Sequence, residues 1–293
     1  MSNEIDSAVC RILEAFSKEE ICGEVVKTEE RPETIYPDVK YPEGFYIKVQ
    51  RTGHSAFYSW FVPAKQEDRP LIVMMPGYHA FIYQMPDVSE KYNFLFVSPL
   101  GYVTPQGRDY SKFEHGVRPV MYNTIHGRED GYEQWTLDVL AAIKWVDGEY
   151  GLGSVPIVTA GTSQGGGMSL VLGSILKPRT AAICADEPWL IGFSGERIEE
   201  IVNQNCYGME IVRMSQVEKN LLPFDPVRHR ERLTMPVLVT ASDADNDCPA
   251  VYIEKMFADI PEPKRLVKYT DRPHGYDISF FNKMLDFLSE NNI

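Results

Sequence analysis

Residues 155–170 read VPIVTAGTSQGGGMSL, and this stretch decides the fold of the 293-residue chain. Residues 155–160 are a short apolar run, typical of a buried strand. A serine framed by glycines follows in Gly161-Thr162-Ser163-Gln164-Gly165, and residues 167–176 are small or apolar, as in a buried helix. A strand, a sharp turn and a helix in this order are the local context that a nucleophile elbow requires.

The two framing glycines have a steric role. Gly161 and Gly165 flank a residue held in a strained backbone conformation, and a side chain at either position would collide with the neighbouring strand or helix. The turn places Ser163 Oγ at the start of the helix, where free N–H groups and the helix dipole favour negative charge. A phosphate-binding loop is the alternative interpretation, but no Lys-Ser or Lys-Thr pair follows the glycines.

Composition excludes several classes of partner. The formal net charge of −13 argues against nucleic acid and against an anionic membrane as partners, because both repel an acidic surface. The first residues, MSNEIDSAVC, do not resemble a secretory signal, and no run approaches the ~18 apolar residues of a membrane span. With 44% hydrophobic residues, the chain can bury the core of one large α/β domain.

The cysteines predict a reducing compartment. They are odd in number, scattered, and without the spacing of metal ligands: Cys10, Cys22, Cys184, Cys206 and Cys248. We therefore expect reduced thiols in a cytoplasmic protein, with neither a metal nor a cofactor.

The order of apolar segments predicts a mostly parallel sheet of about eight strands with helices on both faces. The predicted strands are 45–50, 55–62, 71–75, 93–97, 155–160, 181–185, 236–241 and 265–269, the first two forming an antiparallel hairpin at a sheet edge. The predicted helices are 4–20, 132–147, 167–176, 249–259 and 276–291. We expect residues 1–293 to form a single domain in which a helical insertion at about 187–230, after the sixth strand, covers the site.

An elbow serine needs a base and an acid, which follow it in the order serine, acid, histidine. His274 lies in a Pro/Gly-bounded loop between the last strand and the last helix, which is the place of the base. The other histidines lie elsewhere in this order: His54, His79, His115, His126 and His229. His274 is therefore the predicted base.

The acid belongs in the loop after strand 236–241, which contains three aspartates. We favour Asp245, four residues before the proline that opens the next helix. Asp243 is the alternative, and Asp247 could cap that helix. The acid would hold the histidine tautomer and stabilise the imidazolium.

The oxyanion hole needs two backbone N–H groups. One is that of Gln164, which follows the nucleophile, and the other comes from the loop after strand 71–75, where Tyr78 lies. In the alternative interpretation, Pro76-Gly77 is only a turn.

With these residues in place, the chain resembles the α/β-hydrolases and, within them, the acetyl xylan esterase and cephalosporin C deacetylase family of carbohydrate esterases. The stretches that carry the resemblance are GTSQGGG at 161–167, Gly77-Tyr78, DGYEQWTLD at 130–138, FDPVRHRERLTMPVLVTASDAD at 224–245, Cys248-Pro249 and His274. The chain departs from the family pattern in three places. The Arg-Gly-Gln motif after the second core strand is not intact, with Gln106-Gly107 as its remnant and no arginine in the motif's place. Gly275 follows the histidine where the family has an acidic residue, and the N-terminal arm differs.

The resemblance implies a metal-independent serine esterase that acts on a small acyl ester, often acetyl on a sugar. It also implies a narrow acyl pocket, lined by Tyr78, Gln164, Trp189 and Leu190, and a homo-oligomer. A peptidase or thioesterase on the same scaffold is one alternative, since fold does not fix the substrate. A non-catalytic binding protein is the other, and the complete order of serine, acid and histidine argues against it.

Overall fold

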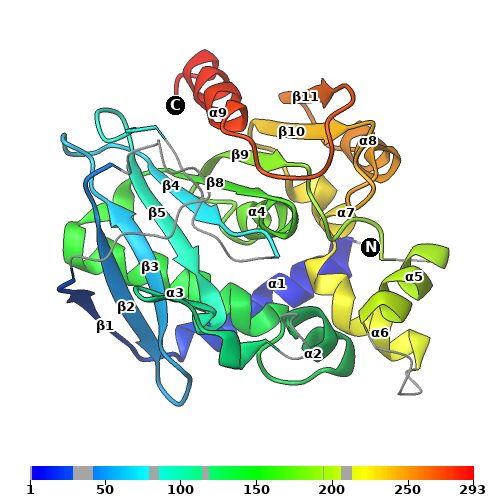
Figure 1. The fold of residues 1–293 in the computed structure, drawn as a ribbon, viewed down its shortest axis with the longest axis horizontal. Coiled ribbons are helices and arrows are strands. Elements are labelled where there is room, and N and C mark those ends of the chain that lie inside the picture. The colour runs from blue at the N-terminus through cyan, green and yellow to red at the C-terminus, as the bar shows by residue number, and fades with distance from the viewer. Residues whose placement is uncertain (1, 29–41, 79–85, 114–118, 194, 206–212) are drawn as a thin grey trace.

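The computed structural model describes residues 2–28, 42–78, 86–113, 119–193, 195–205 and 213–293. Its main feature is a nine-stranded sheet with the order β1-β2-β3-β5-β4-β8-β9-β10-β11 (Figure 1). The strands are β1 Ile21–Val26, β2 Phe45–Arg51, β3 Phe57–Val62, β4 Leu71–Met75, β5 Asn93–Ser98, β8 Ile157–Thr162, β9 Thr180–Asp186, β10 Val237–Ser242 and β11 Lys264–Tyr269. From β5 to β11 the neighbouring strands are parallel, whereas β1, β2 and β3 pair antiparallel.

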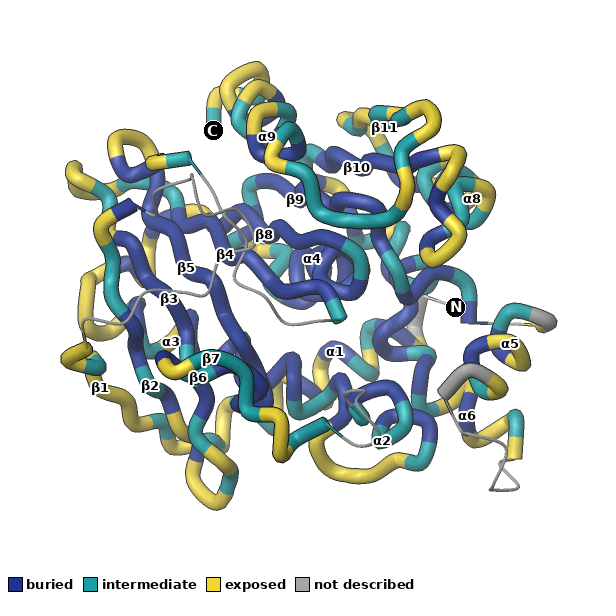
Figure 2. Tube along the Cα trace, in the orientation of Figure 1, coloured by how far each residue is buried: buried dark blue, intermediate teal, exposed yellow. Residues whose placement is uncertain are grey.

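All eight predicted strands are present, and the α/β-hydrolase fold is confirmed. The ninth strand, β1, was missed because its sequence, ICGEVV, has four central residues exposed and so shows no apolar alternation. The predicted hairpin is therefore not at the edge, since β1 pairs outside β2, with Val25 opposite Ile47. Exposed β1 contrasts with the buried central strands in Figure 2.

Helices cover both faces of the sheet, as predicted. The described helices, including those of the connecting segments, are α1 Ser2–Ser17, α2 Val120–His126, α3 Tyr132–Tyr150, α4 Gln164–Ile175, α5 Glu196–Asn205, α6 Met214–Leu221, α7 Pro226–His229, α8 Ala250–Ala258 and α9 Ser279–Glu290. One buried cluster joins α1, α3 and α4 to the sheet, and another joins α9 to the opposite face. The consecutive residues Val73 and Met74 of β4 belong to the first and the second cluster, so the strand is buried on both sides.

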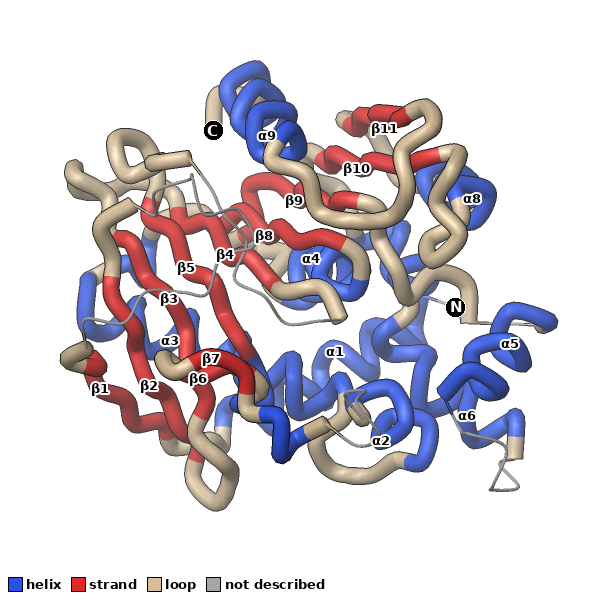
Figure 3. Tube along the Cα trace, viewed as in Figure 1, coloured by secondary structure: helices blue, strands red, loops and turns tan. Residues whose placement is uncertain are grey.

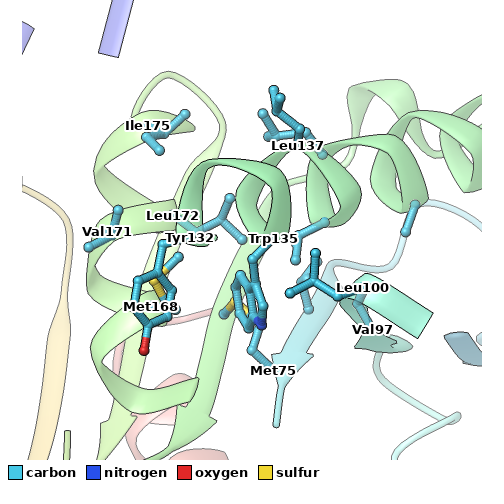
Figure 4. Packing of buried hydrophobic residues seen from close by; sticks show 14 of the residues in the cluster. Met75, Val97, Leu100, Tyr132, Trp135, Leu137, Met168, Val171, Leu172 and Ile175 are labelled. Carbon is cyan, nitrogen blue, oxygen red and sulfur yellow. The ribbon is translucent and has the colours of Figure 1, made fainter. Parts of the chain in front are cut away.

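Packing against α3 fixes the position of α4, the helix that begins directly after Ser163. Tyr132 and Trp135 of α3 lie in the same buried cluster as Met168 of α4 and Met75 at the end of β4 (Figure 4). All four side chains are inaccessible to solvent. Burying an aromatic side chain of this kind contributes about 1.5–3 kcal/mol, so this packing holds the helix that starts at the elbow.

Two connecting segments contain structure of their own. The segment 98–131 includes a two-stranded ribbon, β6 Val103–Thr104 and β7 Gly107–Arg108, followed by α2. The segment between β9 and β10 contains α5, α6 and α7. It is anchored by Asp225, a buried side chain whose carboxylate accepts from the N–H groups of Gly192, Phe193 and Val227 at 2.8–3.0 Å.

Candidate active site

Ser163 lies in the sharp turn between β8 and α4, with φ 58° and ψ −120°. A Cβ at Gly161 would come closer than 3.0 Å to the Gly165 backbone, and one at Gly165 closer than 3.0 Å to the Met75 carbonyl. The turn is held from outside as well, because Ser163 N–H donates to the Asp186 carbonyl at 2.8 Å. This is the strained nucleophile elbow that the sequence predicts.

The structure brings the predicted serine, histidine and aspartate together. His274, in the long loop between β11 and α9 (Figure 3), has Nε2 at 3.0 Å from Ser163 Oγ. Its Nδ1 lies 2.7 Å from Asp245 Oδ2. An imidazole protonated on Nδ1 donates to Asp245 and leaves Nε2 to accept the Ser163 proton.

Backbone geometry distinguishes Asp245 from its two neighbours in the loop. Asp245 is buried, and its Oδ1 accepts from the N–H groups of Asp247 at 2.8 Å and Cys248 at 2.7 Å. Asp243 is exposed and accepts from the Asp271 N–H at 2.8 Å. Asp247 does not cap α8, because that helix has Pro249 at its N-cap and no side-chain cap.

His274 and Asp245 shift each other's pKa in opposite directions. Burial alone would lower the pKa of His274, but the hydrogen bond and charge of Asp245 outweigh it and raise that pKa. Burial would raise the pKa of Asp245, but the hydrogen bonds from His274 and from the backbone lower it. The site therefore holds an ionised carboxylate beside a histidine of increased basicity, which is suited to accept a hydroxyl proton.

The two residues predicted for the oxyanion hole lie on adjoining elements. Gln164 is the first residue of α4, where a backbone N–H has no carbonyl partner inside the helix. Its buried side chain accepts from the Tyr132 hydroxyl at 3.0 Å. Tyr78 lies three residues after the end of β4, and a Cβ at Gly165 would come closer than 3.0 Å to the carbonyls of Met75 and Pro76. The assignment of the two donors stays a prediction.

The predicted pocket residues differ in exposure. Trp189 is half-buried. Its backbone N–H donates to the Ser163 carbonyl at 2.9 Å, so this residue lies beside the elbow. Leu190 is only 1% exposed and belongs to the buried core cluster. Trp189 is therefore the better placed of the two to contact a substrate.

Sequence reasoning missed two charged residues next to His274. Glu187 directly follows β9 and lies 3.6 Å from His274 Nδ1, measured from Oε2. Arg272 donates to the Gly275 carbonyl at 2.8 Å, and its Nε lies 3.6 Å from Glu187 Oε1. An acid directly after a parallel strand, at the edge where Ser163 and Asp245 also follow strands, was the signal that could have revealed Glu187.

The remaining histidines of the described residues have other partners. His229 is buried, with Nδ1 at 2.8 Å from Ser174 Oγ and Nε2 at 2.8 Å from the Pro223 carbonyl. His126 lies 2.8 Å from the Tyr122 carbonyl, and His54 lies 2.6 Å from the Gln134 amide. The described residues do not include two further histidines and one cysteine considered above, which are His79, His115 and Cys206.

Cys248 adds a thiol to the site. Its Sγ lies 3.9 Å from Ser163 Oγ, and it forms with Asp245 and His274 a group whose donor atoms lie within 4.8 Å of one another. Burial raises the pKa of the Cys248 thiol well above its usual value. Because burial favours the neutral thiol, Cys248 adds no negative charge beside Ser163 near neutral pH.

A serine on a strand–turn–helix elbow, with an acid and a histidine after the following strands of a mostly parallel sheet, defines a serine hydrolase of the α/β-hydrolase fold. A family model described as acetyl xylan esterase (AXE1) matches residues 23–291, so the chain belongs to the acetyl xylan esterase family of ester hydrolases. The family that the sequence resembles is thereby confirmed, and the chain is an esterase.

Solved structures show the same fold at low sequence identity. Acetyl xylan esterase 1 from Thermoanaerobacterium sp. JW/SL YS485 is 17% identical with a TM-score of 0.72, covering 99% of this chain and 94% of that one. Acetyl xylan esterase from Paenibacillus sp. R4 is 19% identical with a TM-score of 0.71, covering 98% and 94%. Acylaminoacyl peptidase from Pyrococcus horikoshii is 18% identical with a TM-score of 0.59, covering 87% and 42%. A search of the curated proteins finds no match.

Within the described part of the chain, no helix combines the length and apolar character needed to cross a membrane.

Proposed function

We propose that Ser163, His274 and Asp245 are the catalytic triad of this esterase and that it removes small acyl groups, above all acetyl, from sugar esters. The continuous chain of contacts from Ser163 Oγ through His274 to Asp245, at 3.0 and 2.7 Å, is the observation that supports it. Both distances are within hydrogen-bond range, as proton transfer between these groups requires.

In the proposed mechanism, Ser163 Oγ attacks the acyl carbon while His274 Nε2 takes the hydroxyl proton. His274 then gives that proton to the departing alcohol, leaving an acyl-enzyme. Water, deprotonated by the same nitrogen, attacks the acyl carbon, and the proton returns to Ser163 as the acid departs. Asp245 keeps Nδ1 protonated and stabilises the imidazolium in both steps.

The negative oxygen of each tetrahedral intermediate would be bound by the backbone N–H groups of Gln164 and Tyr78. Each donor is worth about 3 kcal/mol at the transition state. The anchored loop that contains Trp189 would limit the acyl chain, since the Trp189 backbone is tied to the elbow. We propose that the insertion between β9 and β10 covers the alcohol side of the ester.

Hydrolysis of p-nitrophenyl esters from acetyl to octanoyl tests this proposal. We expect the highest kcat/KM with acetyl and a steep decrease with chain length, and we expect sugar acetates to be cleaved. A preference for octanoyl, or for an acylated amino-acid anilide, would contradict it and favour a lipase-like or peptidase activity.

We also propose that the protein works in the cytoplasm as a homo-oligomer. Four of its cysteines, Cys10, Cys22, Cys184 and Cys248, are unpaired thiols, which suits a reducing compartment. The oligomer is implied by the family resemblance, and light scattering of the purified chain would test it.

A further inference from the structure

His274 faces two carboxylates. Asp245 approaches Nδ1 from the loop after β10, at 2.7 Å, and Glu187 approaches the same nitrogen from the end of β9, at 3.6 Å. Glu187 is completely inaccessible to solvent. Its Oε2 also accepts from the Gly275 N–H at 3.3 Å, so it contacts the backbone next to the histidine.

The position of Glu187 is fixed by its own backbone. Its N–H donates to Thr240 Oγ1 at 3.0 Å, and its φ of 41° is unusual for a residue with a side chain. Asp186, one residue earlier, accepts from Thr240 at 2.6 Å and from Thr162 at 3.0 Å. The end of β9 is therefore held in a strained conformation that directs Glu187 toward the histidine.

The polar groups of Glu187 are incompletely paired. Among the residues that the structure describes, its buried Oε1 has no hydrogen-bond partner, and the Arg272 Nε lies 3.6 Å away, beyond hydrogen-bond distance. A buried carboxylate oxygen left in this way costs free energy, since it has lost its water without gaining a full partner. Such a cost is typical of a functional site.

The described charged and titratable groups that face Glu187 come from β9, from the loop after β10, from β11 and from the loop after β11. Negative or neutral groups are Asp186 from β9, Asp245 and Cys248 from the loop after β10, and Tyr269 from β11. Positive charge comes from Arg272 and, when protonated, His274. Asp186 and Glu187 thus share one arginine, Arg272, and a proton on His274 adds positive charge beside Glu187 and Asp245.

We infer that Glu187 is a second acid of the site, a positioning residue that acts with Asp245 on His274 Nδ1 and can replace it there. The inference rests on the proposed function, because it needs His274 to gain a proton during the reaction. A shift of the ring by less than 1 Å would bring Nδ1 within hydrogen-bond distance of Oε2.

The ionisation of Glu187 agrees with this role. Burial, followed by the charge of Asp186, raises its pKa to about 7. Near neutral pH its charge therefore responds to its surroundings, and a protonated His274 favours the ionised carboxylate. The negative charge of Glu187 in turn contributes to the raised pKa of His274, after burial and Asp245 have acted on it.

Removing Asp245 tests whether Glu187 can replace it. In a triad with one acid, loss of the acid function lowers kcat by about 10⁴-fold. With p-nitrophenyl acetate, we expect Asp245→Ala to lose only about 10²-fold and Asp245→Ala/Glu187→Gln to lose about 10⁴-fold. A loss of about 10⁴-fold in Asp245→Ala, unchanged by adding Glu187→Gln, would overturn the inference.

The pH profile of Glu187→Gln tests the same inference without touching Asp245. Because the negative charge of Glu187 raises the pKa of His274, its removal should move the acidic limb of kcat/KM to lower pH by roughly half to one unit. Asp247→Asn is the matched control, since this carboxylate acts on the same histidine but is exposed. We expect a smaller shift there because water screens its charge.

A Glu187→Gln profile that coincides with the native one would exclude the second acid. The activity of the native chain distinguishes a failure of the proposed function from a failure of the inference about Glu187. If it hydrolyses no ester at any pH, the proposed function fails, whereas an active native enzyme with unaffected Glu187 variants refutes only the inference.

Discussion

In two places the chain buries an arginine beside carboxylates, and the distances between these groups differ. In the first, Arg51 of β2 donates to Asp138 of α3 at 2.8 Å and to Glu19 at 2.9 Å. Asp138 also accepts from the Leu100 N–H at 2.9 Å. In the second, next to His274, the separations between Arg272 and the carboxylates of Glu187 and Asp186 are 3.6 and 4.0 Å.

The difference separates structural from functional use of buried charge. Burial raises the pKa of Asp138 to about 6, although Arg51 opposes it, and raises that of Glu187 to about 7. The opposite charges of Arg51 and Asp138 neutralise each other at short distance. The Asp138 carboxylate also fixes the turn at Leu100, whose φ is 62°. The long contacts around Glu187 leave negative charge for a proton on His274 to compensate.

The largest expected effect on activity is that of removing His274, the histidine that both Asp245 and Glu187 face. We expect His274→Ala to lower kcat/KM for p-nitrophenyl acetate by about 10⁶-fold, because serine then lacks its base. His126→Ala is the control, since that histidine lies on α2 with its Nδ1 at 2.8 Å from the Tyr122 carbonyl of the same helix. Comparable losses in both variants would mean that the histidine loop is not the site of proton transfer.

Breaking the structural cluster should affect stability and leave catalysis intact. Asp138→Ala leaves Arg51 buried beside Glu19 alone, and we expect the free energy of unfolding to fall by about 3–5 kcal/mol. Urea denaturation would measure this, with kcat/KM at 25 °C within about threefold of native for the folded fraction.

A paired replacement sharpens this test. Arg51→Met/Asp138→Leu removes both charges, and we expect it to recover most of the stability that Asp138→Ala loses, since apolar replacements of buried ion pairs are often neutral. If the double variant were no more stable than Asp138→Ala, the ion pair would not be the cause of the loss.

The smallest expected effect is a stability change with pH at Glu187. Its pKa is about 7 in the folded chain and near 4.5 when unfolded. The native state therefore favours the protonated acid, and this contribution is fully present below pH 4.5 and lost as pH rises through 7. Glu187→Gln, which cannot ionise, should gain Tm relative to native by about 2–4 °C between pH 5 and pH 8.

Thermal unfolding at both pH values would show it. A Tm difference that does not change with pH would mean that the folded chain does not raise the pKa of Glu187, and the role given to the second cluster would fail.

Much of the fold and site could be predicted because the signals are local. The strand, glycine turn and helix around Ser163 are contiguous, and His274 follows the last strand in a recognisable loop. The choice of Asp245 over Asp243 rested on its position relative to Pro249, and the structure now gives the physical reason. Only Asp245 has its Oδ1 held by two backbone N–H groups while Oδ2 faces the histidine.

The remainder depends on contacts between distant segments. Glu187 lies 87 positions before His274, so no spacing rule connects them, and its charge state depends on burial that composition does not reveal. Arg51 of β2 likewise donates to Asp138, which accepts from the Leu100 N–H after β5, although 87 positions separate Arg51 from Asp138. Strand β1 escaped prediction because it lies at an exposed edge.

Covalent labelling with a fluorophosphonate tests most directly that Ser163 is the nucleophile activated by His274. Mass spectrometry of the treated native chain should show one adduct, on the peptide that contains Ser163, and p-nitrophenyl acetate hydrolysis should disappear in proportion. Ser163→Ala should remain unlabelled, and His274→Ala should label far more slowly. Labelling of another residue, or full esterase activity in Ser163→Ala, would contradict the account.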